Sequence, residues 1–380
     1  MIYLDNAATS WPKPSGVGKT MQEALARCGN PGRSGHRMSL DAGRILLGCR
    51  EALAQLLHVS DPLSVLFCLN CTDGLNMAIK GLLPKGGHVV TTALEHNAVL
   101  RPLGTLRQRG LVQFDAAPFN RNGQVTPAAL EALIRPDTRL AVVTHVSNVT
   151  GMIQPLEDII PMFHRHGIPV VVDGAQSAGH IPLNLDQLGA DAYVTAGHKG
   201  LLGPQGVGII VLSPTCRPLT LREGGTGSAS LELTQPQELP DRYECGTAAT
   251  PAIAGLWAAV EFIQRFETVL MAQEQRMRQQ LLEGLAAIDA VRLLTPADPA
   301  LPGVGVVSFT LGDMDSSAVG DYLEQRYMIA CRPGLHCAPL VHRAMGTAQN
   351  GAIRFSIGAF TTEREIQRAV SAVAAMAEGL

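Results

Sequence analysis

The chain has 380 residues, of which 46% are hydrophobic and 17% charged. This length and composition exclude general disorder and allow two or three domain-sized units around a large core. The net charge of −3 and an aromatic content of only 4% argue against a nucleic-acid partner. We expect no membrane span and no signal peptide. The eight cysteines are too sparse for a disulfide scaffold, so a reducing, cytoplasmic setting is expected.

The first 212 residues predict an α/β unit. Short β-branched runs alternate with amphipathic stretches from residue 64 onward, which is typical of βαβ units and of a mostly parallel sheet buried on both faces. Such sheets bind ligands beyond the carboxyl ends of their strands. Strands are expected at residues 65–69, 89–92, 140–146, 170–173, 192–195 and 207–212, and helices at 15–28, 40–57, 72–83, 97–109, 127–134 and 156–166.

The remaining residues predict a different, α+β pattern. A connector rich in Gly, Ser and Pro covers residues 223–240. A long helical pattern follows at residues 250–288, and after it strands and helices no longer alternate regularly. The expected elements are strands at 304–310 and 352–357 and helices at 316–326 and 363–379.

Two motifs resemble functional sites but have simpler interpretations. The triplet Gly18-Lys19-Thr20 imitates the end of a P-loop, yet the motif needs a glycine where this chain has Lys13. The pair Cys68 and Cys71 forms a lone CxxC without the second pair that a structural zinc site requires. We therefore expect a helix start and buried small hydrophobic side chains, respectively, and no metal site.

Two of the expected strands end in polar groups that suit one particular chemistry. The first ends at Asp173, and the second runs into a glycine-rich turn that carries His198 and Lys199. Singly, Asp173 is a reasonable helix N-cap and Lys199 a solvated loop lysine. Together at one sheet edge, they match the needs of pyridoxal phosphate (PLP), which forms a Schiff base with a lysine and requires an acid at its ring nitrogen.

At this point the sequence resembles the class V aminotransferase group of PLP enzymes, and within it the cysteine desulfurases. The resemblance implies the PLP-dependent transferase fold-type I. It consists of a large domain (residues 15–249) with a mostly parallel seven-stranded sheet and a small α+β domain (residues 1–14 and 250–380). The segments that carry the resemblance are Tyr3–Thr9, Glu95–Asn97, Ser147–Gly151, Asp173–Gln176, Gly197–Lys199, Glu244–Thr247, Arg332–Cys337 and Arg354–Ser356.

The resemblance also implies roles for individual residues around the cofactor. Lys199 would carry PLP, Asp173 would face the ring nitrogen, and His96 would stack on the ring and serve in proton transfer. Relatives usually have a hydroxyl residue where this chain has Ala196, so we expect a thinner phosphate site. The full set implied for the cofactor is Cys71, Thr72, His96, Asn148, Asp173, Gln176, His198, Lys199 and, from the second subunit of a homodimer, Thr247.

For the substrate, the resemblance implies Arg354 as the partner of the amino acid's carboxylate, with Asn148 and Ala7 close by. Cys337 lies in the compact pattern of the short-loop branch of the family and would be the catalytic nucleophile, while His336 and Arg332 would favour its thiolate. For each residue a structural role stays open, namely a buried ion pair for Arg354 and an inert thiol for Cys337.

The implied reaction converts L-cysteine to L-alanine and leaves a persulfide on Cys337. A sulfur-acceptor protein could then take up this sulfur. Three alternatives remain open. One is a selenocysteine lyase or cysteine sulfinate desulfinase on the same scaffold. Another is a different class V enzyme, such as an aminotransferase or epimerase, and the third is a non-catalytic PLP-dependent regulator.

Overall fold

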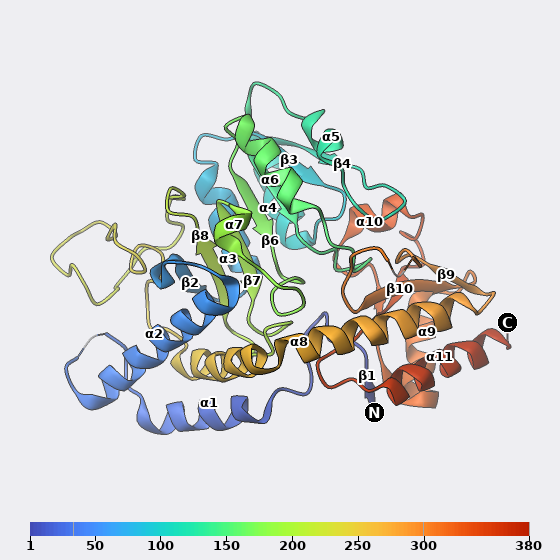
Figure 1. The fold of residues 1–380 in the computed structure, drawn as a ribbon. Helices are drawn as coiled ribbons and strands as arrows, with labels where there is room; N and C mark the ends of the chain where they lie inside the picture. Colours follow the sequence, from blue (N-terminus) through green and yellow to red (C-terminus); the bar gives the residue numbers. More distant parts are fainter. Residues whose placement is uncertain (33, 299, 380) are drawn as a thin grey trace.

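The computed structural model describes residues 1–32, 34–298 and 300–379, and a seven-stranded sheet forms its centre (Figure 1). The strand order is β2-β8-β7-β6-β5-β3-β4, and only β8 runs antiparallel to its neighbours. The expected mostly parallel sheet is therefore confirmed. Its strands are β2 (Val65–Cys68), β3 (Gly87–Thr92), β4 (Val112–Ala117), β5 (Thr138–Thr144), β6 (Val170–Asp173), β7 (Ala192–Ala196) and β8 (Gly208–Leu212).

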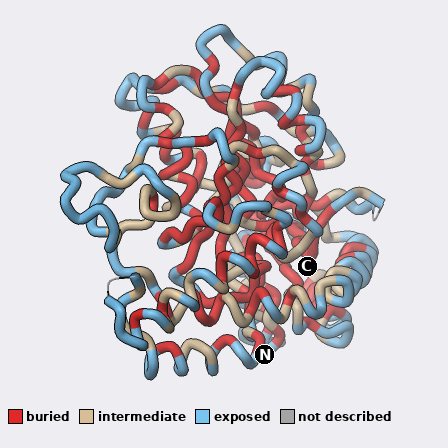
Figure 2. The backbone as a smooth tube through the Cα atoms, turned by 60° about the vertical axis from the view of Figure 1, so that its left-hand side comes forward, coloured by how far each residue is buried: buried red, intermediate tan, exposed pale blue. Residues whose placement is uncertain are grey.

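Helices cover both faces of this sheet because side chains on each strand point alternately to either side. In β6, Val170 and Val172 join the core on one face and Val171 joins the core on the other. Figure 2 shows the resulting buried interior enclosed by exposed helix and loop surfaces. Helices α3 (Cys71–Leu82) and α4 (Asn97–Gln108) cover one face; α2 (Arg37–Leu57), α5 (Pro127–Glu131), α6 (Leu156–Arg165) and α7 (Leu185–Leu188) cover the other.

A second, smaller unit contains a four-stranded antiparallel sheet with the order β12-β13-β10-β9. The N-terminal strand β1 (Ile2–Tyr3) pairs in parallel with β11 (Ile329–Ala330), so the chain's two ends meet in this unit. Its other elements are β9 (Val291–Leu293), β10 (Val306–Leu311), α9 (Ser316–Tyr327), β12 (Arg332–Gly334), α10 (Pro339–Ala344), β13 (Ala352–Ser356) and α11 (Glu363–Ala377).

The long helix α8 (Thr250–Ala286) connects the two units and packs against α1 (Ser15–Arg27) and α2 (Figure 1). Ile253 and Val260 in its first half belong to the core of the large sheet, whereas Met277 and Leu281 in its second half belong to the core of the small unit. We therefore propose that the division expected at residue 250 falls within α8, and that this helix is shared by both domains.

Among the described residues, none of the helices is both long enough and apolar enough to cross a lipid bilayer.

Candidate active site

The carboxyl ends of β6 and β7 bring Asp173 and Lys199 to one edge of the large sheet. The two strands pair in parallel, with Asp173 opposite Val194, and Lys199 follows three residues after the end of β7. Gly174 permits this close approach, because a Cβ there would lie 2.1 Å from the ring of Tyr193. As the sequence predicts, the acid and the lysine therefore lie at the same edge.

A cavity of about 220 Å³ opens at this edge. Apart from Thr247, every residue predicted to bind the cofactor lines it. Ala7, Arg354, Cys337 and Thr247 lie outside the lining, in the positions described below. The predicted residues that line the cavity are Cys71, Thr72, His96, Asn148, Asp173, Gln176, His198 and Lys199.

The floor of the cavity holds an acid, a thiol and an amine. One oxygen of Asp173 accepts hydrogen bonds from the amide of Ala175 (3.0 Å) and the thiol of Cys71 (3.7 Å). Burial raises the pKa of Asp173 and lowers the pKa of Lys199, while the negative charge of Asp173 opposes the latter shift. Burial raises the pKa of Cys71 well above its ordinary value, so the thiol keeps its proton. The lysine is thus biased toward the uncharged amine, which is the nucleophilic form.

Beside these groups, the N-terminus of α3 presents backbone donors that the helix itself does not use. The side chain of Asn70 caps the amide of Asp73 at 2.9 Å, whereas the amides of Cys71 and Thr72 have no partner within the helix by its geometry. The helix dipole adds positive potential at this point. Nδ1 of His198 is buried next to the cavity and has no hydrogen-bond partner among the described residues. This end of the cavity therefore suits an anionic group such as a phosphate.

Thr195 and Ala196, neighbours at the end of β7, point to opposite sides of the strand. The hydroxyl of Thr195 donates to the carbonyl of Gly174 at 3.0 Å, and it is Ala196 that lines the cavity. The neighbouring threonine therefore does not replace the hydroxyl that relatives usually carry at position 196.

Three flat polar groups also line the cavity. His96 is the N-cap of α4, and its Nδ1 accepts from the amide of Ala98 at 3.0 Å, so Nε2 carries the proton. Burial lowers the pKa of His96 to about 4, which leaves a neutral ring at pH 7. Gln176 donates from Nε2 to the carbonyl of Ala7 at 2.9 Å, while no residue that the structure describes bonds to its buried Oε1. Asn148 is the third group and is held by the loop described next.

Cys337 lies on the wall of an adjoining depression of about 280 Å³, which shares Thr72, His96 and Ala98 with the first cavity. Its carbonyl accepts from the amide of Asn97 at 2.7 Å. The guanidinium of Arg332 is 3.9 Å from the sulfur. A nucleophilic thiol would thus reach the lysine's cavity from its open side.

The expectation that His336 adds positive charge next to this thiol is wrong. The ring of His336 is 3% exposed and bonds to the carbonyl of Arg332 and to His342. Burial lowers the pKa of His336 well below its ordinary value, and Arg354 adds to this effect. The ring is therefore neutral, and Arg332 is the cation in contact with the sulfur.

Arg354 is buried and already has a partner. Its Nη2 pairs with the carboxylate of Asp5 at 3.0 Å, and its Nη1 donates to the carbonyl of Asn148 at 3.1 Å. Its Nε is buried and lacks a partner within the described part of the chain. Burial lowers the pKa of Arg354 to about 10, so it stays charged at pH 7. The structural ion pair foreseen as an alternative is therefore present, and a substrate carboxylate would have to compete with Asp5 or use Nε.

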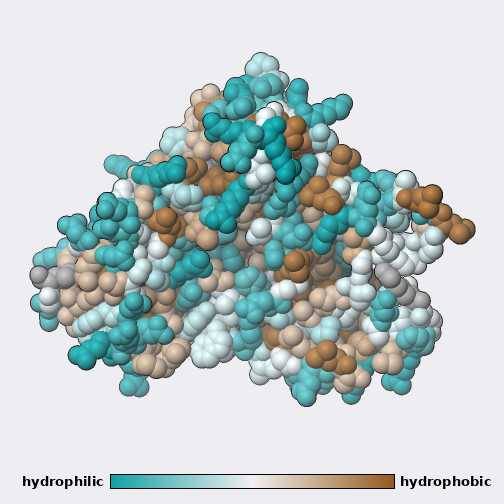
Figure 3. Space-filling view, turned by 180° about the vertical axis from the view of Figure 1, so that it is seen from behind, coloured by the Kyte–Doolittle hydropathy of each residue, from teal (hydrophilic) through white to brown (hydrophobic). Residues whose placement is uncertain are grey.

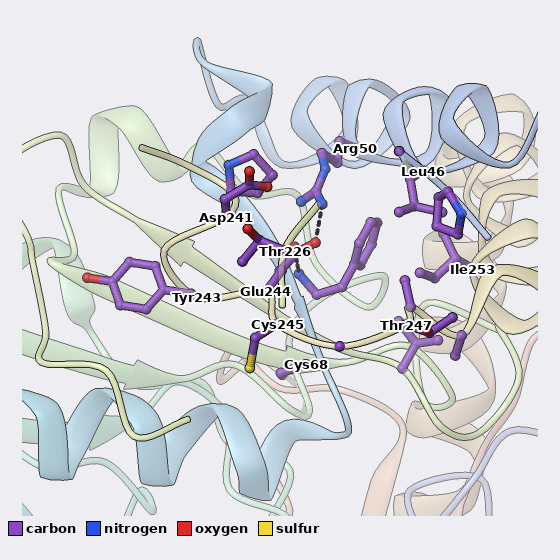
Figure 4. A pocket seen from close by; sticks show the side chains of 18 of the residues that line it. Leu46, Arg50, Cys68, Thr226, Asp241, Tyr243, Glu244, Cys245, Thr247 and Ile253 are labelled. Atoms are coloured by element: carbon purple, nitrogen blue, oxygen red, sulfur yellow. Dashed lines mark hydrogen bonds and ion pairs between the residues drawn. The ribbon is translucent and has the colours of Figure 1, made fainter. Parts of the chain in front are cut away.

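Thr247 lines a separate cavity of about 420 Å³ between α2 and the loop before α8 (Figure 4). Its segment is anchored by Glu244, which forms a largely buried ion pair with Arg50 and accepts from the amide of Phe67 at 2.6 Å. Figure 4 shows the Arg50–Glu244 pair, with Thr247 at another part of the wall. Within one chain, then, Thr247 does not join the lysine's cavity.

Sequence reasoning missed two groups that hold the site. Lys13 donates to the carbonyl of His198 at 3.0 Å, and the buried Glu95 accepts from Thr92 and from the amide of Thr144. In the sequence, Lys13 stands out only because it occupies a position where a P-loop needs a glycine. Its contact joins residues 185 positions apart, so no local pattern could have revealed it.

The chain belongs to the family described as Aminotransferase class-V, whose sequence pattern matches residues 2–369. It is similar to a cysteine desulfurase from Yersinia pestis (strain Pestoides F), with 32% identity over 98% of this chain and 92% of the relative.

Solved structures lead to the same group of proteins. The apo structure of a cysteine desulfurase from Thermococcus onnurineus NA1 superimposes with a TM-score of 0.91 and 29% identity, covering 100% of this chain and 95% of that one. The Escherichia coli cysteine desulfurase CsdA, in an S-sulfonic acid form, superimposes with a TM-score of 0.88 and 26% identity, again covering 100% and 95% of the two chains. The expected fold class is thereby confirmed.

Proposed function

We propose that this protein is a PLP-dependent cysteine desulfurase, which converts L-cysteine to L-alanine and retains the sulfur as a persulfide on Cys337. The observation that carries the proposal is the position of Cys337. Its depression joins the cavity that holds Lys199 and Asp173. The similarity to cysteine desulfurases over the whole chain supports the same activity.

The residues around the cavity suit PLP by their donor chemistry. The free amides at the start of α3 and the unpartnered Nδ1 of His198 suit the phosphate. Gln176 uses one of the two protons on its Nε2 for Ala7 and keeps the other for the ring oxygen. Asp173 would hold the proton of the ring nitrogen. Bound there, PLP would supply an electron sink for bond breaking at the substrate's Cα.

Three of the protein's own residues would then act in separate steps of the reaction. Nζ of Lys199 would move the Cα proton, because burial favours its neutral form. Sγ of Cys337 would attack the sulfur of the substrate. The carbon–sulfur bond breaks, and the products are L-alanine and a Cys337 persulfide, which balances all atoms. Arg332, 3.9 Å from the sulfur, would stabilise negative charge there.

The decisive experiment assays alanine and sulfide from L-cysteine, with a thiol reductant, in the wild type and in Cys337→Ala. The wild type should show the visible absorbance of lysine-bound cofactor and form both products. Cys337→Ala should keep the absorbance and lose most of the activity. Equal alanine formation by both proteins would overturn the desulfurase assignment and favour another class V enzyme. Parallel assays on selenocysteine and cysteine sulfinate would separate the related lyases.

We also propose that the enzyme works as a homodimer in which Thr247 of one chain completes the phosphate site of the other. The exposed position of Thr247, outside the cavity of its own chain, supports this arrangement. A sulfur-acceptor protein would take the persulfide from the open side of the Cys337 depression. We propose a cytoplasmic setting, in which cysteines remain reduced.

A further inference from the structure

A chain of buried hydrogen bonds lies behind the loop that carries Cys337. Thr347, His342 and His336 are 4%, 0% and 3% exposed. The hydroxyl of Thr347 lies 2.8 Å from Nδ1 of His342, and Nε2 of His342 lies 3.2 Å from Nδ1 of His336. Nε2 of His336 lies 2.9 Å from the carbonyl oxygen of Arg332. Every ring nitrogen of the pair therefore has a partner.

The direction of each hydrogen bond follows from the last one. A carbonyl can only accept, so Nε2 of His336 donates to Arg332, and in a neutral ring Nδ1 must then accept. Nε2 of His342 is therefore the donor to His336, and its own Nδ1 must accept from the hydroxyl of Thr347. One arrangement of protons satisfies all three groups, and burial keeps both imidazoles neutral by lowering their pKa values.

The loop that these bonds hold has an unfavourable backbone. His336 and Cys337 have φ values of +49° and +57°, in the left-handed region that side chains other than glycine rarely adopt. Two successive residues persist there only when their surroundings fix them. The carbonyl of His336 accepts from Asn148 at 2.7 Å, and that of Cys337 accepts from Asn97 at 2.7 Å. The ring of His336, bonded to Arg332 and His342, provides a third anchor.

We propose that His342 is a positioning residue that acts through His336 to hold the thiol of Cys337 at the active site, with Thr347 selecting its tautomer. The inference deepens the proposed function and rests on it for the role of the thiol. His342 lines neither the cavity of Lys199 nor the depression of Cys337. Its effect is therefore on the loop and not on substrate or cofactor directly.

The test compares Thr347→Val, which removes the hydroxyl while nearly keeping the shape, with Thr347→Ser, which keeps the hydroxyl. Without that donor, His342 is free to hold its proton on Nδ1 and cannot then donate to His336. In the purified holoenzyme, Thr347→Val should lower kcat about fivefold, the scale of one buried hydrogen bond. KM for cysteine and the cofactor absorbance should stay unchanged, and Thr347→Ser should match the wild type.

A second measurement follows the thiol itself. The rate of Cys337 alkylation by iodoacetamide, read by mass spectrometry, should change by a similar factor in Thr347→Val and His342→Leu. It should return toward the wild-type rate in His342→Gln, whose amide can both accept and donate. Arg343→Leu, at the exposed neighbouring position on α10, serves as the control.

Unchanged alkylation and unchanged kcat in Thr347→Val would overturn the positioning role. A fall in kcat with unaltered alkylation would also contradict it, because the thiol would not have moved. If the wild type produced no alanine while the alkylation rates still differed, the proposed function would fail and the control of the loop would stand.

Discussion

At the scale of single residues, Glu95 has an unusual environment directly before His96. Its side chain is fully buried, and one oxygen accepts from Thr92 and from the amide of Thr144. The other oxygen has no partner in residues 1–32, 34–298 and 300–379. Burial raises the pKa of Glu95 from 4.5 to about 8, against the effect of these hydrogen bonds. At pH 7 the side chain is therefore protonated and neutral. Its hydrogen bonds hold the strand end in front of His96, and it adds no charge to the cavity.

This protonation state predicts a pH dependence of stability. Between pH 4.5 and 8 the folded chain holds a proton on Glu95 that the unfolded chain releases, so this group lowers the free energy of unfolding as pH rises. Glu95→Gln keeps an oxygen for Thr92 and Thr144 but cannot ionise. The melting temperature of Glu95→Gln minus that of the wild type should increase by about 2 °C or more between pH 5 and pH 8.

Thermal unfolding of both proteins at the two pH values measures this gain. Glu261→Gln, at an exposed position of α8, should show no such change. A melting difference between Glu95→Gln and the wild type that is independent of pH would mean that the carboxyl does not hold its proton in the folded chain.

The sequence predicts that Asp173 and Lys199 lie close together because their positions depend on where two strands end. Asp173 and Lys199 follow apolar runs, and parallel strands bring their carboxyl ends to one edge. The neutral state of His336 and the roles of His342 and Lys13 depend instead on contacts made only in the folded chain. Residue types and spacing contain no signal for such contacts.

At the scale of elements, the strands that sequence reasoning found are those buried on both faces. β4 was missed because it is an edge strand whose sequence, VQFDAA, alternates buried and exposed positions. The antiparallel direction of β8 was not foreseen either, since an apolar run does not indicate direction. The helix α5 ends at Glu131, three residues before the expected end at Ile134.

The end of β7 offers a prediction of its own. Ala196 lines the cavity where relatives usually carry a hydroxyl residue, and the hydroxyl of Thr195 is bound to Gly174. Ala196→Ser would place a donor next to the proposed phosphate position. Dissociation of the cofactor during dialysis, followed by its absorbance, should slow about threefold or more. Ala196→Val adds volume without a donor and should not slow it; equal or faster loss from the serine variant would contradict the phosphate assignment.

At the scale of the whole molecule, the loop between β8 and α8 projects from the body (Figure 1). Leu231 and Leu233 in this loop are 99% and 103% exposed. Figure 3 shows apolar side chains on a projecting edge on the corresponding side. Two apolar side chains this exposed and this close in sequence are suited to an interface. The same loop continues to Thr247. A second chain that covers the two leucines would therefore also contact Thr247.

A subunit-mixing experiment tests the shared site. Lys199→Ala removes the lysine, and Thr247→Asp places a negative charge where the partner's phosphate is proposed to bind; each homodimer should be inactive. A heterodimer with one chain of each variant can be purified by two different affinity tags. If Thr247 belongs to the partner's site, one site of this heterodimer carries both changes and the other carries neither. If the sites are shared, the heterodimer should regain about half of the wild-type activity, because a twofold dimer has two equivalent sites. If each chain completed its own site, both sites of the heterodimer would be defective, so activity no higher than that of the parent variants would rule out sharing.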